Sequence, residues 1–122
     1  MEEKKRDILE RTKQFALRIV RLYSALPRTT VAQVIDKQVL RSGTSVGAHV
    51  REGKRSRSNA EMVSKTEGAL QELEETVYWL ELLVESETVK PKQLADLITE
   101  ADELTAILVA SVKTIKRRSE KK

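Results

Sequence analysis

The single histidine of the chain, His49, has two neighbours that could take part in nucleophilic catalysis. Ser45 lies four residues before it and Glu52 three residues after it, so a helix would bring a nucleophile, a base and an orienting carboxylate to one face. Acyl transfer also needs an oxyanion hole, which this arrangement on the side of a helix does not supply. We therefore favour a buried or interfacial polar cluster over a catalytic site.

A phosphate-binding loop and a metal site fail on spacing or residue type. Gly47 and the pair Gly53-Lys54 are separated by five residues where a P-loop has four, and Arg55 replaces the Ser or Thr that the loop requires. The absence of cysteine and the presence of one histidine exclude thiolate nucleophiles, iron–sulfur clusters, Cys-ligated zinc and sites with two imidazoles. We expect no enzyme activity, no metal and no cofactor.

The acidic run Glu72, Glu74 and Glu75 could also be read as a metal site or a pair of acid catalysts. The chain has 19 acidic residues, so a solvated helix face or a salt bridge to Arg41 is the simpler interpretation.

Charge changes sign along the chain. Residues 1–57 carry 14 Lys/Arg and 6 Asp/Glu, residues 58–112 carry 3 and 12, and residues 113–122 carry 6 and 1. The simplest consequence is that acidic helices pack beside basic ones, which needs no ligand.

Two basic clusters could instead contact nucleic-acid phosphates. They are Arg51, Lys54, Arg55 and Arg57 at one predicted turn, and Lys116, Arg117, Arg118, Lys121 and Lys122 at the tail. We expect the two clusters at opposite ends of one protomer, so that a continuous patch requires oligomerisation.

The elements that must position these residues are helices. Apolar residues recur at steps of three and four. On the second helix, the side expected to face the core is marked by Val31, Val34, Ile35, Val39, Val46 and Val50. Short connections between such helices are typical of an antiparallel up-down four-helix bundle. We expect an all-α protein, folded as one domain over residues 1–122. The predicted helices are 5–26, 30–53, 58–87 and 91–118.

Capping residues support these boundaries. Boxes of the form Ser/Thr-x-x-Gln/Glu begin at Thr30 and Ser58, and Pro91 suits the first turn of a helix. Gly53 offers a left-handed end for the second helix.

Two glycines lie inside the second predicted helix, where each costs roughly 1 kcal/mol relative to alanine. Gly43 and Gly47 therefore indicate a close approach by another helix backbone. Antiparallel pairing of the second and third helices places Ser45 opposite Gly68 and Arg41 near the acidic run.

Around Tyr78, Trp79 and Leu83 the third helix is apolar over more of its surface than one core seam requires. Excess apolar surface of this kind predicts a subunit interface.

No part of the sequence resembles a signal peptide or a membrane span. The most apolar window, residues 77–84, is short and contains Glu81. We expect a soluble, cytoplasmic protein with no membrane partner.

Several motifs together resemble the four helix bundle protein family, also called the 23S rRNA intervening-sequence protein family. The likeness extends over nearly all of the chain, and its most specific part is the run from Arg41 to Gly53 followed by Glu67 to Glu74. Family members commonly have Asn-Ile-Ala-Glu where this chain has His49-Val-Arg-Glu52. The matching motifs are Leu26-Pro27, Gln38-Val-Leu-Arg-Ser42, Thr44-Ser-Val46, Ala48-His-Val-Arg-Glu-Gly53, Arg55-Ser-Arg-Ser58 and Glu67-Gly-Ala-Leu-Gln-Glu-Leu-Glu74.

The resemblance implies a bundle that assembles as a homopentamer and has a link to RNA, with no enzymatic activity attached to the family. We therefore expect a non-catalytic homo-oligomer that binds RNA or DNA backbones through its basic clusters. The alternative is an adaptor that binds another protein and no nucleic acid.

Overall fold

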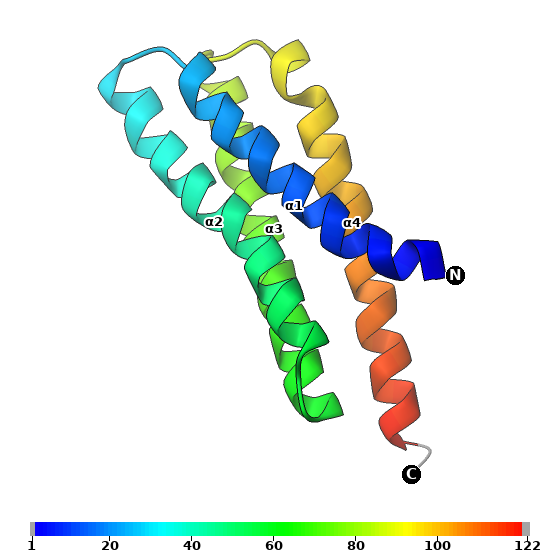
Figure 1. Ribbon diagram of the computed structural model, residues 1–122. Coiled ribbons are helices and arrows are strands. Elements are labelled where there is room, and N and C mark those ends of the chain that lie inside the picture. Colours follow the sequence, from blue (N-terminus) through cyan, green and yellow to red (C-terminus); the bar gives the residue numbers. More distant parts are fainter. Residues whose placement is uncertain (1, 121–122) are drawn as a thin grey trace.

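The computed structural model describes residues 2–120, with side chains described from residue 8 onward, and forms a bundle of four helices (Figure 1). The helices are α1 (Glu2–Ala25), α2 (Thr30–Lys54), α3 (Asn59–Glu85) and α4 (Pro91–Glu120). Successive helices run in opposite directions, α2 and α3 pair most extensively, and α1 packs on α2 and to a lesser extent on α4. The predicted all-α, up-down bundle is confirmed.

The core is an apolar seam that all four helices share. Phe15 of α1, Val46 of α2, Leu73 and Leu80 of α3, and Leu104 of α4 are all completely buried. Steps of three and four residues keep each helix's seam turned towards its neighbours, which is the geometry of antiparallel bundles.

The start of α2 buries a different side from the predicted one, whereas its later predicted positions, from Val39 to Val50, are buried. Val31 and Val34 are 55% and 58% exposed, whereas Ala32, Asp36 and Val39 are buried. The buried seam keeps its seven-residue spacing, but a small residue and a carboxylate occupy two of its positions. A search for large apolar side chains therefore selects the wrong face at the start of α2.

Two predicted ends of α2 are also corrected. The side chain of Thr29 accepts a hydrogen bond from the backbone N–H of Ala32, so the helix is capped one residue before Thr30. Gly53 stays inside the helix with a negative φ and lies against Lys65 of α3, so it is a packing residue and not a left-handed cap.

The starts of α3 and α4 agree with the prediction. Ser58 caps α3 by accepting a hydrogen bond from the N–H of Glu61, and α4 begins at Pro91.

Gly43 and Gly47 mark a close helix crossing, as predicted, and the helix that approaches is α1. A Cβ atom added to Gly43 would lie 2.8 Å from Cγ1 of Ile19, and one added to Gly47 would lie 3.4 Å from Oγ1 of Thr12. These two glycines therefore set how closely α1 can pack on α2.

Gly68 lies opposite His49, so the predicted pairing with Ser45 is wrong by one helical turn. A Cβ atom on Gly68 would lie 3.3 Å from the His49 ring. Helical side chains lean towards the N-terminus of their own helix. In this hairpin α2 side chains therefore lean away from the turn and α3 side chains lean towards it, which pairs each α2 residue with a later α3 residue than a symmetric count predicts.

Candidate nucleic-acid interface

The α2–α3 turn and the C-terminal part of α4 lie at the same end of the bundle (Figure 1). The prediction that the two basic clusters lie at opposite ends is wrong. Successive helices alternate in direction, so the α2–α3 turn and the C-terminus of α4 lie at the same end of the bundle. An ion pair of 3.6 Å between Lys116 Nζ and Glu67 Oε2 joins the end of α4 to the first half of α3. The basic clusters therefore lie at the same end of one protomer.

We name this surface the basic end. All of its members have exposed side chains, and Lys113 joins the predicted set because it lies one turn before Arg117 on α4. Lys121 and Lys122, also predicted for this cluster, lie outside the described residues. The basic end comprises Arg51, Lys54, Arg55, Arg57, Lys113, Lys116, Arg117 and Arg118.

Most cations of the basic end are available to a ligand. Within residues 8–120, Lys116 is the member of this set that forms an ion pair. Glu52, a carboxylate beside these cations, is occupied by Lys65 at 3.0 Å, and the hydrogen bond from Lys65 holds the pKa of Glu52 below its ordinary value. Glu52 is therefore already paired, and the other members of the basic end have no ion-pair partner within residues 8–120.

Elsewhere, opposite charges pair inside the protomer as the segment charges predict. Arg11 of α1 contacts Glu100 and Glu103 of α4 at 2.6 and 2.9 Å. Arg41 of α2 contacts Glu72 of α3 at 3.4 Å and also pairs with Glu75. Apart from Lys116, the cations of the basic end lack such an ion pair within residues 8–120.

A groove between α1 and α2 extends the positive surface. Its volume is about 430 Å³, and small residues such as Ala16, Gly47 and Ala48 contribute to its lining. Lys13, Arg51 and Arg55 also line it, together with Glu52. Since Arg51 and Arg55 belong to the basic end as well, the groove and the basic end are continuous.

The aromatic residues lie away from the basic end. Phe15 is buried in the core, Tyr23 lies in the last turns of α1, and Tyr78 and Trp79 lie in the half of α3 farther from the α2–α3 turn. Base stacking needs exposed aromatic rings, so the chemistry that this end offers is contact with phosphates.

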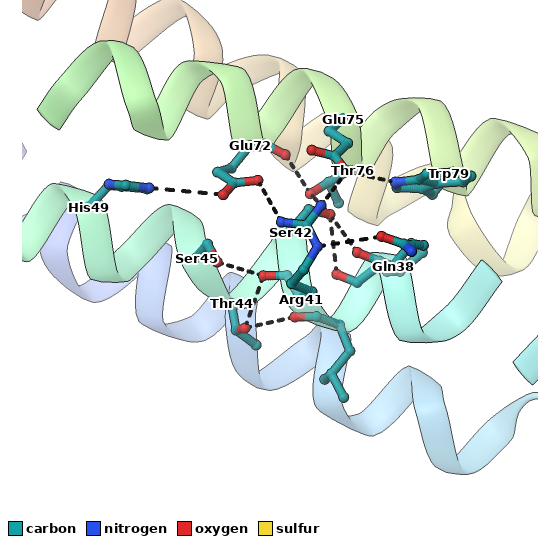
Figure 2. A network of polar contacts seen from close by, with 12 residues as sticks. Gln38, Arg41, Ser42, Thr44, Ser45, His49, Glu72, Glu75, Thr76 and Trp79 are labelled. Carbon is teal, nitrogen blue, oxygen red and sulfur yellow. Dashed lines mark hydrogen bonds and ion pairs between the residues drawn. The ribbon is translucent and has the colours of Figure 1, made fainter. Parts of the chain in front are cut away.

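A network of polar contacts joins α2 to α3 around Arg41 (Figure 2). Arg41 binds both Glu72 and Glu75, and the Trp79 indole donates to Glu75 at 3.2 Å. These hydrogen bonds, led by the one from Arg41, lower the pKa of Glu75. The predicted salt bridge between Arg41 and the acidic run is confirmed.

His49, Ser45 and Glu52 do not form a triad. Nε2 of His49 lies 3.9 Å from a carboxylate oxygen of Glu72 (Figure 2). Ser45 donates to the backbone carbonyl of Arg41, and Glu52 pairs across the hairpin with Lys65. The three side chains thus have separate partners, and the arrangement suits helix pairing.

Of the three predicted interface residues, Leu83 is wrong because it is completely buried in the core. Tyr78 is 53% exposed, and Trp79 is half-buried and packs edge-on against the Tyr78 ring. Further exposed apolar side chains lie near the α1–α2 connection, among them Val31 and Val34. This exposed surface was not predicted, because Val31 and Val34 were expected in the core.

The part of the chain that the structure describes has neither a membrane-spanning helix nor a metal-binding cluster. No helix there is long and apolar enough to cross a membrane. No group of three or more His, Asp or Glu side chains in that part of the chain is placed to hold a metal ion.

Comparison with known proteins identifies a family and similar solved structures. Residues 4–110 match the family described as 23S rRNA-intervening sequence protein. A crystal structure from Bacteroides thetaiotaomicron, described as a protein with unknown function from the S23 ribosomal protein family, is 37% identical, with a TM-score of 0.85 over 90% of this chain and 98% of that chain. No curated protein matches the chain.

Proposed function

The chain belongs to the 23S rRNA-intervening sequence protein family, and on that basis we propose that it is a non-catalytic, homo-oligomeric helical bundle that binds the phosphate backbone of RNA or DNA. The observation that carries this proposal is the basic end, where two exposed clusters far apart in sequence lie at the same end of the bundle.

Phosphate contacts explain this arrangement better than internal stability does. Exposed ion pairs contribute little to folding, and repulsion among like charges at one end opposes it. Contact with phosphates releases counterions from the nucleic acid, so the binding affinity should fall steeply as salt is added.

The same surface favours backbone contact over sequence recognition. Arg51 and Arg55 connect the basic end to the α1–α2 groove, so a strand lying there would meet cations along its length. With the aromatic side chains elsewhere, the basic end has no ring on which to stack bases, and its affinity should depend little on base sequence.

Homo-oligomerisation is supported by the apolar side chains that the protomer leaves exposed. Tyr78, Val31 and Val34 are each more than half exposed, and a sister copy would remove such surface from water. Five copies, the number that the family resemblance implies, would present the basic end five times. Several weak phosphate contacts made at once would raise the overall affinity for one nucleic acid.

A binding measurement with two matched double variants tests the nucleic-acid part of the proposal. Fluorescence anisotropy would follow a labelled RNA hairpin and a labelled DNA duplex at about 50 and about 200 mM salt. The double variant Arg55→Gln/Arg57→Gln removes two charges from the basic end. Lys90→Gln/Lys92→Gln removes two from the opposite end.

We expect the wild type to bind both nucleic acids at low salt, the first variant to bind more weakly, and the second to match the wild type. Absence of binding to either nucleic acid at low salt would refute the proposal, as would equal losses in the two variants.

The protein adaptor is the second candidate, and the exposed Tyr78, Val31 and Val34 are the observation that favours it. A stoichiometric protein partner that stays bound after nuclease treatment would support the adaptor. Loss of that partner in Val34→Ser would place the contact on this apolar surface.

A further inference from the structure

Asp36 is a carboxylate in the hydrophobic core. It lies on the buried seam of α2 between Ala32 and Val39, and it is 2% exposed. Within the described part of the chain, neither of its carboxylate oxygens has a hydrogen-bond partner. Burial raises its pKa from 3.8 to about 6, so at neutral pH most molecules carry a negative charge there. Buried charges are normally paired, and this one lacks its partner.

A cavity of about 380 Å³ adjoins this carboxylate at the connection between α1 and α2. Asp36 and Ala32 are the buried residues in its lining, and Leu26 and Pro27 add apolar surface. The Tyr23 ring also lines it. The exposed polar side chains around the cavity are those of Ser24, Arg28 and Gln33.

We propose that this cavity binds a cationic nitrogen group, an ammonium or guanidinium on an aliphatic stem, with Asp36 as its counter-ion. A charged N–H donor is the strongest partner for a buried carboxylate. The stem would lie along Leu26 and Pro27, and the face of Tyr23 attracts cations. A hard metal ion would need several oxygen ligands, and Asp36 is the one carboxylate in the lining.

Arg28 limits the choice of ligand. It lines the cavity, yet it forms no ion pair with Asp36 in the described structure. Its positive charge at the exposed side would repel a second cationic group, so the cavity favours a ligand with one positive charge over a polyamine. The ligand is either a free amine or a Lys or Arg side chain of a second copy. This inference does not depend on nucleic-acid binding.

Carbon-detected NMR of ¹³C-labelled protein tests the counter-ion directly. The Asp36 carboxyl is titrated with pH in the presence and absence of n-butylamine hydrochloride, with sodium chloride and n-butanol as controls. Tyr23 and Arg28 are the other titratable groups lining the cavity. For a free-amine site, we expect butylammonium alone to lower the pKa of Asp36 from about 6, and Asp36→Asn to bind it about tenfold more weakly or worse.

Solution mass distinguishes the two sources of the cation. If a free amine is the ligand, butylammonium raises the melting temperature and the oligomer mass is the same in wild type and Asp36→Asn. If a sister chain supplies the cation, Asp36→Asn lowers the mass, while its circular-dichroism spectrum shows that the helices remain. An Asp36 pKa unmoved by butylammonium, together with an unchanged mass in Asp36→Asn, would overturn the proposal and leave Asp36 without a cationic partner.

Discussion

At the scale of single residues, Asp36 makes the protein less stable as pH rises. Its pKa is about 6 in the folded chain, against an ordinary value of 3.8, so between these pH values the folded state holds a proton that the unfolded state has lost. The contribution of Asp36 to the free energy of unfolding is therefore greatest at low pH and is lost as the pH rises to about 6.

Replacing this carboxyl by an amide should therefore remove one source of pH dependence. Between about pH 4.5 and about pH 8 we expect the wild type to lose roughly 2 kcal/mol of unfolding free energy relative to Asp36→Asn. Urea unfolding of both proteins at the two pH values measures this difference. The comparison cancels carboxylates such as Glu75, whose lowered pKa acts in the opposite direction. Parallel pH profiles would contradict the assignment.

A buried pair of hydroxyl groups joins α2 to α3. Thr76 donates to Oγ of Ser42 at 2.7 Å, and both residues are buried. We expect Thr76→Val to cost about 1 kcal/mol because Ser42 loses its cross-helix partner. A double-mutant cycle with Ser42→Ala, followed by chemical unfolding, should show that the double variant loses less than the sum of the two single losses. Strict additivity would show that this hydrogen bond does not contribute.

At the scale of elements, the crossing of α1 over α2 depends on glycine at one position more than at the other. An added Cβ on Gly43 would come within 2.8 Å of the fully buried Ile19, whereas on Gly47 the nearest atom lies at 3.4 Å. Alanine improves helix propensity at both sites by roughly 1 kcal/mol.

Alanine at these two sites should therefore have opposite effects. We expect Gly43→Ala to destabilise by about 1 to 2 kcal/mol, since overpacking outweighs the propensity gain, and Gly47→Ala to be neutral or stabilising. Thermal melts of the two variants test this. Equal shifts in melting temperature would mean that the crossing does not determine the requirement for glycine.

Helix types and most helix ends were predictable from local chemistry. Ser58 and Pro91 are capping residues with a direct structural reason, and the leucine spacing of α4 identifies its buried side. Thr29 and Thr30 are chemically equivalent as caps, so the sequence could not distinguish them. Asp36 occupies a core position that its charge argues against, which is why the buried side was misplaced at the start of α2.

Most residues of the basic end could be predicted from the sequence, but their positions in the bundle could be predicted less well. Six of the seven cations predicted for nucleic-acid contact are exposed and without an ion pair in the described part of the chain, and Lys116 pairs with Glu67. Both clusters lie at one end of the bundle because the four helices alternate in direction, which the sequence-based prediction of opposite ends did not apply correctly. Cross-helix partners such as His49 and Gly68 depend on side-chain lean and axial offset, which residue counting alone does not provide.

At the scale of the whole molecule, the two basic clusters should act as one binding surface. Arg55→Gln/Arg57→Gln weakens the α2–α3 side of the basic end, and Arg117→Gln/Arg118→Gln weakens the α4 side. If one nucleic acid contacts both sides, each double variant loses phosphate contacts independently of the other.

The salt dependence of RNA binding measures those contacts. We expect a plot of log affinity against log salt concentration to become shallower by about 1 to 2 in each double variant, and by about twice as much when all four charges are removed. The charge-matched Lys90→Gln/Lys92→Gln should keep the wild-type slope. Equal slopes in all of these proteins, or a slope changed as much by Lys90→Gln/Lys92→Gln as by the basic-end variants, would show that this end does not bind the nucleic-acid backbone.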